Sequence, residues 1–214
     1  KYPEKKDVPI WITEFNTSDH VKPYDISVRL ENGLWLAQYI PEFIRNFGSR
    51  GYMMLWDVMN GGSAITNPTG GDHGYLQAEQ GPYQYQERAD YWVIKMLTNY
   101  WSSPGDDKDH VMVDANSGNT MLAVYGNLKP DKTLSLLVVN KDPENAYNAA
   151  ISINGYVPSR DAKVWKFDKD NYKWVTDEQP YHADPSKPPT EYSISNAGEK
   201  FNFEFKPYSV TVIK

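Results

Sequence analysis

One carboxylate follows directly on an apolar, β-branched segment. Ile10 to Thr13 form a continuous run of the kind seen in strands that are buried on both faces of a parallel sheet. Glu14 stands at the carboxyl end of this run, and barrels of parallel strands and helices carry their active sites at that end. A carboxylate there could act as a nucleophile or a general base. The local pattern fits an ordinary surface glutamate equally well.

Further side chains in the same part of the chain could contact a ligand. Trp56 ends a second apolar run, and its ring could stack on the face of a sugar or lie in the core. Asn16 could touch a hydroxyl group or close an Asx turn. Asp72 and His73 could hydrogen-bond a substrate or brace the loop that holds them. His20 is expected to face solvent.

The elements that would position these residues form one βαβ unit. Apolar residues recur at helical spacing over residues 27–47, with a kink expected at Pro41 and an end at Gly48. This helix connects the first strand to the apolar run 51–58. A strand, a helix and a second strand at this spacing predict a parallel sheet.

A long loop and a second helix complete the first part of the chain. The loop spans residues 60–83, and loops of that length are usually functional. The helix is expected over residues 84–102, before a linker rich in Ser, Pro, Gly and Asp. We therefore expect residues 1–104 to form an α/β unit.

Beyond the linker, short alternating runs separated by turn residues predict an antiparallel β-sandwich over residues 105–214. The Pro-rich segment 177–190 predicts a long surface loop. The aromatic residues Trp165, Tyr172 and Trp174 could form a glycan-binding platform, although such residues more often pack between sheets or at a domain junction. The expected strands are His110–Val113, Thr120–Tyr125, Thr133–Asn140, Asn148–Ile153, Ala162–Phe167, Tyr172–Val175, Lys200–Phe205 and Ser209–Ile213.

The first part is too small to form a closed barrel. It offers two parallel strands and two helices, whereas a (β/α)₈ barrel needs about 250 residues. Its apolar strands would have open edges. We expect the missing strands to come from another chain or from a longer polypeptide that ends here. The first residue is Lys1 rather than Met, which fits a processed or excised piece.

Composition narrows the class of partner. A net charge of −6 with no basic run argues against nucleic acid, and the absence of cysteine excludes disulfides and thiolate metal sites. No apolar run approaches the ~18 residues of a membrane span, so no membrane partner is expected. The four histidines lack metal-binding spacing, and we expect neither a metal nor another cofactor. Sixteen Tyr and seven Trp suit a sugar site, although they also fill ordinary cores.

The segment Ile-Thr-Glu-Phe-Asn-Thr-Ser at residues 12–18 resembles the seventh-strand motif of clan A retaining glycoside hydrolases, most closely family 39, the β-xylosidase and α-L-iduronidase group. This resemblance implies that Glu14 is the nucleophile. Residues 52–57 resemble the eighth strand, where a Trp lines the sugar site, and residues 72–76 resemble the loop after it. The ending at residues 205–212 is typical of sandwiches in several such families. The chain would then hold the last two βα units of a (β/α)₈ barrel followed by the sandwich.

Two departures from that pattern matter. Asp19-His20 stands where an aromatic residue is expected, and the sequence has no Asn-Glu pair, the motif that carries the acid/base glutamate of the family. Retaining hydrolysis needs two carboxyl groups. The acid/base group would therefore come from a missing N-terminal barrel portion, either a separate chain or a removed segment.

The sequence thus predicts a secreted glycosidase that cleaves polysaccharides or oligosaccharides, with xylosides or arabinosides favoured by the resemblance. Two alternatives remain at this point. The chain could be a non-catalytic carbohydrate-binding or scaffolding module built on the sandwich. It could also be a structural fragment whose barrel remnant is inert until it is paired.

Overall fold

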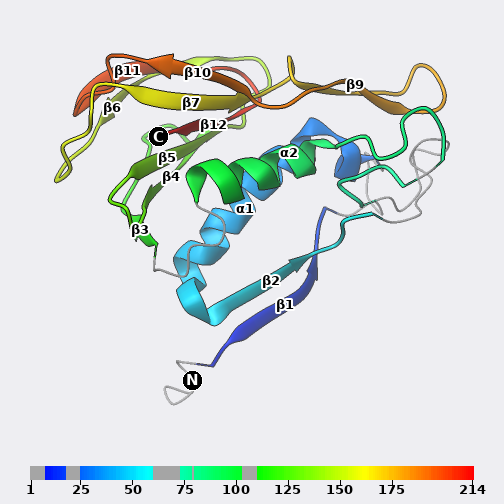
Figure 1. The fold of residues 1–214 in the computed structure, drawn as a ribbon, viewed down its shortest axis with the longest axis horizontal. Helices are drawn as coiled ribbons and strands as arrows, with labels where there is room; N and C mark the ends of the chain where they lie inside the picture. The colour runs from blue at the N-terminus through cyan, green and yellow to red at the C-terminus, as the bar shows by residue number, and fades with distance from the viewer. Residues whose placement is uncertain (1–7, 18–24, 60–72, 79, 103–109) are drawn as a thin grey trace.

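The chain folds into four stacked layers (Figure 1). The structure, a computed structural model, describes residues 8–17, 25–59, 73–78, 80–102 and 110–214. A two-stranded parallel sheet, β1–β2, forms one outer layer, and helices α1 and α2 lie between it and a six-stranded antiparallel sheet. The antiparallel pair of β6 (Tyr147–Ser152) and β11 (Lys200–Phe205) covers the far face of the six-stranded sheet.

The predicted strand–helix–strand unit is confirmed. β1 (Ile10–Phe15) leads through α1 (Leu30–Phe47) to β2 (Gly51–Leu55), and the two strands pair in parallel. The helix begins three residues later than predicted, because Ile26–Val28 form a 3₁₀ turn. It ends at Gly48, whose φ of 53° is a backbone conformation that suits glycine. The helix continues through Pro41, and the kink there stays a prediction.

The second helix is shorter than the sequence predicts. α2 spans Ala89–Lys95 and runs into a π-helical stretch, Met96–Trp101. The predicted first turn from residue 84 is not helical, because the backbone there pairs with residues 76 and 77 instead: Leu76 and Glu87 form an antiparallel bridge, and Gln77 donates its amide to the carbonyl of Gln86 at 3.0 Å. Tertiary pairing therefore overrides the local helical pattern.

The antiparallel part follows the predicted strands closely. The six-stranded sheet has the order β10-β7-β12-β5-β4-β3, and two further pairs are β11–β6 and β8–β9. The strands are β3 (Val111–Val113), β4 (Leu122–Leu128), β5 (Leu134–Asn140), β6 (Tyr147–Ser152), β7 (Ala162–Phe167), β8 (Tyr172–Val175), β9 (His182–Ser186), β10 (Thr190–Ile194), β11 (Lys200–Phe205) and β12 (Ser209–Ile213).

The prediction of a loop over residues 177–190 is wrong in part, because β9 lies inside it and β10 begins at its end. β9 pairs only with β8, and such an edge position tolerates Pro185, which made the segment look like a loop. β10 is the edge of the large sheet and is mostly exposed, so its sequence lacks an apolar face. The division of the chain at residue 104 stays a prediction.

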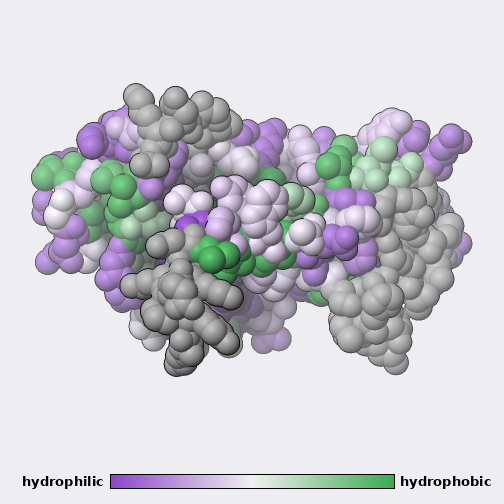
Figure 2. Space-filling view, turned by 90° about the horizontal axis from the view of Figure 1, so that it is seen from below, coloured by the Kyte–Doolittle hydropathy of each residue, from purple (hydrophilic) through white to green (hydrophobic). Residues whose placement is uncertain are grey.

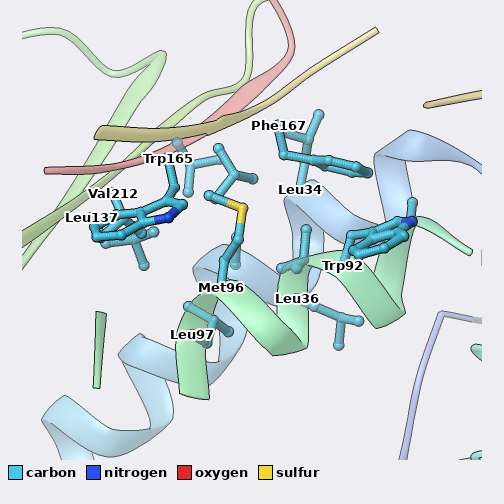
Figure 3. Close-up of a cluster of buried hydrophobic side chains, with 14 of the residues drawn as sticks. Leu34, Leu36, Trp92, Met96, Leu97, Leu137, Trp165, Phe167 and Val212 are labelled. Atoms are coloured by element: carbon cyan, nitrogen blue, oxygen red, sulfur yellow. The ribbon is translucent and has the colours of Figure 1, made fainter. Parts of the chain in front are cut away.

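The main core lies between the helices and the six-stranded sheet (Figure 3). The cluster includes Leu34 from α1 and Met96 from the π-helical stretch, together with Leu137, Phe167 and Val212 from three central strands. A second, smaller core fills the space between the same sheet and the β6–β11 pair. Each face of the large sheet is thus covered by its own apolar cluster.

The expectation that the first strand is buried on both faces is wrong. Phe15 and Leu55 pack toward the helices, but Trp11 is 59% exposed and Met54 is 49% exposed. The ring of Trp11 stacks on Tyr52 with centroids 4.8 Å apart, so one aromatic pair stands on the outer face. The reason is that, among the described residues, this sheet has two strands and is covered by helices on one side. Figure 2 views the molecule from this side, with hydrophobic residues in green near the middle of the face.

Candidate active site

Glu14 sits at an irregularity in the pairing of β1 with β2. Ile12 pairs with Met53 and Phe15 pairs with Leu55, so three steps along β1 match two steps along β2. The extra residue corresponds to a β-bulge, a feature that redirects side chains and is common beside active sites. Thr13 and Glu14 are both exposed there. The strand extends one residue beyond Glu14, so Glu14 is the second-last residue of β1 rather than the first residue after it.

Asn16 ties three segments together just beyond β1. Its side-chain amide donates to the carbonyl of Trp56 and, at 3.1 Å, to the carbonyl of His73. Its side-chain oxygen accepts the amide of Thr17 at 2.8 Å. The side chain therefore joins the ends of both parallel strands to the following loop, which is a positioning role.

Trp56 extends the register of β2 past its last paired residue. Its amide donates to the carbonyl of Phe15 at 3.0 Å, and the peptide bond to Asp57 is cis. The side chain is 45% exposed. Because side chains alternate along a strand and Leu55 packs toward the helices, Trp56 faces the opposite side, as Tyr52 does. The ring is thus available at the end of the sheet where Glu14 lies.

His73 begins the described part of the long loop and is half-buried. The loop lies alongside the end of β2: Tyr75 donates its amide to the carbonyl of Asp57 at 3.2 Å, and Leu76 donates to Val58 at 3.0 Å. The loop is therefore an extension of the sheet at this edge. Two other candidates from the sequence, Asp72 and His20, lie outside the described residues.

Sequence reasoning missed Tyr75 as a member of this site. Partial burial raises the pKa of its hydroxyl, and the nearby carboxylates of Asp90 and Asp57 raise it further. The hydroxyl is consequently a persistent proton donor at neutral pH. Its position in the segment 72–76 that resembles a substrate loop was the available signal.

Arg88 holds the loop residues Gly74 and Tyr75 through buried hydrogen bonds. The side chain is 1% exposed, its Nη1 donates to the carbonyl of Gly74 at 2.8 Å, and its amide donates to Tyr75 at 3.0 Å. Its guanidinium lies 5.8 Å from the ring centre of Trp174 in β8. One buried cation thus links the site loop to the antiparallel part of the molecule. No local sequence signal pointed to it.

A second link joins residues 83–87 to β9. The side chain of Gln86 donates to the carbonyl of Ala183 at 2.7 Å and accepts the amide of Ala183 at 2.9 Å. The ring of Tyr83 lies flat on His182, with centroids 3.9 Å apart and planes 4° from parallel. The site loop is thereby held on a hairpin of the sandwich part.

The idea of a glycan platform on the sandwich strands does not hold for two of its three residues. Trp165 is 7% exposed and stacks on Tyr100 with centroids 4.5 Å apart. Tyr172 is 1% exposed and donates its hydroxyl to the carbonyl of Val28 at 2.5 Å. Both side chains pack the junction with the helices, as the alternative interpretation expected.

The described residues give no indication of a metal centre. Among them, no three His, Asp or Glu side chains gather closely enough to hold an ion. In the described parts of the chain, neither helix has the length and apolar character needed to cross a bilayer. What the strand ends do offer is the exposed carboxylate of Glu14 and the exposed indole ring of Trp56, a pair suited to a polar ligand with apolar faces.

Comparison with known proteins bears on the fold. No family model and no curated protein matches the sequence. Among solved structures, the chain is similar to a family 44 xyloglucanase from Paenibacillus polymyxa, with 16% identity and a TM-score of 0.60 over 96% of this chain and 31% of that one. A family 30 endoxylanase from Clostridium papyrosolvens gives 14% identity and a TM-score of 0.61 over 99% and 43%. An α-L-arabinofuranosidase from Thermotoga maritima gives 16% and 0.64 over 98% and 44%.

The chain has the fold of part of a glycoside hydrolase. It spans less than half the length of each of these three enzymes. At such identities the likeness shows a shared fold, and the predicted combination of a partial barrel with a sandwich is consistent with it. The finer resemblance to family 39 stays a prediction.

Proposed function

We propose that this chain carries the nucleophile, Glu14, of a retaining glycoside hydrolase. The observation that supports this most directly is the exposed carboxylate at the irregular end of β1, beside the exposed ring of Trp56 at the end of β2. The shared fold with a xyloglucanase, an endoxylanase and an arabinofuranosidase supports the reaction class.

In this mechanism a carboxylate oxygen of Glu14 attacks the anomeric carbon, and the bond to the leaving oxygen breaks as a second carboxylic acid protonates that oxygen. The same second group then removes a proton from water, which displaces Glu14 and releases the sugar with its configuration retained. Trp56 would stack on a sugar ring, with Asp72 and His73 as candidate hydrogen-bonding partners. No cofactor is needed.

The second carboxyl group is assigned to an N-terminal barrel portion, supplied as a separate chain or a removed segment. It must lie about 5–5.5 Å from Glu14 across the sugar. The open edges of β1–β2 and the exposed outer residues Trp11 and Met54 support this arrangement, because further strands would cover them.

We propose xylosides or arabinosides of plant-type polysaccharides as the substrate class. The likeness to an endoxylanase and to an α-L-arabinofuranosidase in complex with arabinose supports it. Such polymers are too large to enter cells, so the proposal includes secretion.

The test is Glu14→Gln in the longest polypeptide that carries this segment, or in this chain paired with the proposed barrel portion. We expect turnover of an aryl xyloside or arabinoside to fall on the order of 10³-fold while the unfolding midpoint stays unchanged. A 2-fluoro glycoside should label the wild-type peptide at Glu14, as read by mass spectrometry. Glu144→Gln, which alters an exposed carboxylate in a sandwich turn, is the matched control and should keep full turnover.

Full turnover by Glu14→Gln would refute the assignment. If the wild type binds glycans but is neither labelled nor active, the non-catalytic carbohydrate-binding function replaces it.

A further inference from the structure

The loop between the site and α2 exposes one large aromatic side chain in an unusual backbone conformation. Tyr85 has a φ of 65°, a region that bulky residues rarely adopt, and its side chain is 59% exposed. Its amide donates to the carbonyl of Gln77 at 2.8 Å, and the next residue, Gln86, donates to Tyr83 at 3.0 Å. The surrounding hydrogen bonds thus maintain a costly conformation that presents this ring to solvent.

The residues on either side of Tyr85 are fixed to the sandwich part. Tyr83 lies flat on His182, and Gln86 binds both backbone groups of Ala183. The ring of Tyr85 is therefore carried by a segment anchored at two points. A binding group that is already in place loses little conformational entropy when it meets its ligand.

A continuous series of backbone contacts connects this segment to the candidate active site. Tyr75 and Leu76 lie beside Asp57 and Val58 at the end of β2, and Leu76 pairs in turn with Glu87. Two neighbour spacings of this kind amount to about 10 Å. Glu87 is thus roughly that far from Val58, and Tyr85 lies two residues along the chain from Glu87.

The side chain of Gln86 is held against β9 by its two hydrogen bonds to Ala183. The ring of Tyr85 is 59% exposed, and the ring of Trp56 is 45% exposed. Two exposed aromatic rings therefore stand on the connected segments 56–58, 75–77 and 85–87.

We infer that Tyr85 forms a second sugar-binding subsite, on which a further unit of an oligosaccharide stacks while the scissile bond lies at Glu14. Aromatic faces bind the apolar C–H faces of neutral sugar rings, and an uncharged platform matches an uncharged polymer. The location of the scissile bond rests on the proposed function. The subsite itself predicts a preference for longer substrates over single-sugar glycosides.

The test compares Tyr85→Ala, Tyr85→Phe and the control Tyr192→Ala, which removes an exposed ring from β10. The same polypeptide as above is assayed with a linear xylo-oligosaccharide and with a single-sugar aryl xyloside. Tyr85→Ala should raise KM for the oligosaccharide about 5–10-fold and leave kcat and KM for the aryl xyloside unchanged. Tyr85→Phe and Tyr192→Ala should behave as the wild type on both.

An unchanged KM of Tyr85→Ala for the oligosaccharide, or an equal loss on both substrates, would overturn the subsite while the proposed function stands. If the wild type hydrolyses neither substrate, the proposed function fails, and calorimetric titration with the same oligosaccharide decides the subsite alone. Binding that weakens about 5–10-fold in Tyr85→Ala supports it, and binding unaffected by that change, or no binding at all, overturns it.

Discussion

The six-stranded sheet and the β1–β2 sheet both contain apolar strands, but the two sheets differ in how they are covered. All five residues of β12 (Ser209–Ile213) are buried, because helices cover one face of the six-stranded sheet and the β6–β11 pair covers the other. In β1 (Ile10–Phe15) four of six residues are exposed, since the helices cover one face only. Strands with apolar sequences can therefore differ widely in exposure, according to how many faces of their sheet are covered.

The largest expected contrast comes from deleting one apolar side chain in each sheet. Phe167 in β7 is fully buried, and Phe167→Ala should lower the free energy of unfolding by about 3–5 kcal/mol because it leaves a cavity. Met54 on the outer face of β2 is 49% exposed, and Met54→Ala should change it by less than about 0.5 kcal/mol. Urea unfolding of this chain measures both.

If Met54→Ala costs as much as Phe167→Ala, the outer face of β1–β2 is covered in solution, contrary to the comparison. If the outer face is exposed as expected, adding the proposed barrel portion should increase the loss of unfolding free energy caused by Met54→Ala and leave that of Phe167→Ala unchanged.

A smaller contrast concerns one glycine in each sheet. A Cβ on Gly51 in β2 would lie 2.4 Å from Cε1 of Phe43 and 2.9 Å from Cβ of Phe47, both on α1. A Cβ on Gly126 in β4 would lie 2.3 Å from the side chain of Val113, on the edge strand β3. Gly51→Ala should destabilise by about 1–3 kcal/mol, and Gly126→Ala by less, because an edge side chain can move more easily than a packed ring.

Thermal unfolding of the two variants measures this difference. Equal or reversed costs would mean that α1 is held less firmly against β2 than the close approach of Phe43 indicates.

A further contrast is a pH dependence of stability that arises in the well-covered region. Lys129, after β4, is 2% exposed and donates its ammonium to the carbonyls of Tyr100 and Ser102 at 2.9 and 2.7 Å. Burial, with a contribution from Lys214, lowers its pKa from 10.5 to about 8, and Asp131 opposes this. Between about pH 8 and 10.5 the unfolded chain then holds more protons, so this residue makes stability rise with pH in that window.

Lys129→Met should remove that rise, which a series of urea titrations at pH 8, 9 and 10 would measure. Lys169→Met, which alters an exposed lysine, serves as the control and should retain the wild-type slope. A wild-type slope in Lys129→Met would contradict the buried position of this ammonium.

The sequence alone predicted the strands correctly where the local pattern and the tertiary structure agree. The runs at residues 162–167, 172–175, 200–205 and 209–213 became strands with the predicted bounds, because alternation and turn residues point to one structure. β9 was missed because its proline is tolerated only on an edge strand, which a sequence does not reveal.

The candidate site divides in the same way. Glu14 and Trp56 could be proposed from the sequence because each stands at the end of an apolar run. Arg88 and Tyr85 were not, since their significance comes from contacts with residues distant in sequence, Trp174 and Gln77 among them. Burial of β1 was mispredicted because a continuous apolar run does not reveal that, among the described residues, helices cover one face of the β1–β2 sheet only.

The side chain of Gln86 has a consequence for engineering. Its side-chain amide hydrogen-bonds both the N–H and the C=O of Ala183, as the backbone of a neighbouring strand would. The side chain thereby replaces one peptide unit of strand pairing between the two parts of the chain. A shortened protein cut at the linker would lose both partners of this amide together with the stacking surface of Tyr83. The sandwich therefore cannot be removed without breaking contacts that hold residues 83–86. Any chimera that exchanges it must carry along the hairpin β8–β9 or redesign residues 83–88 to match the replacement.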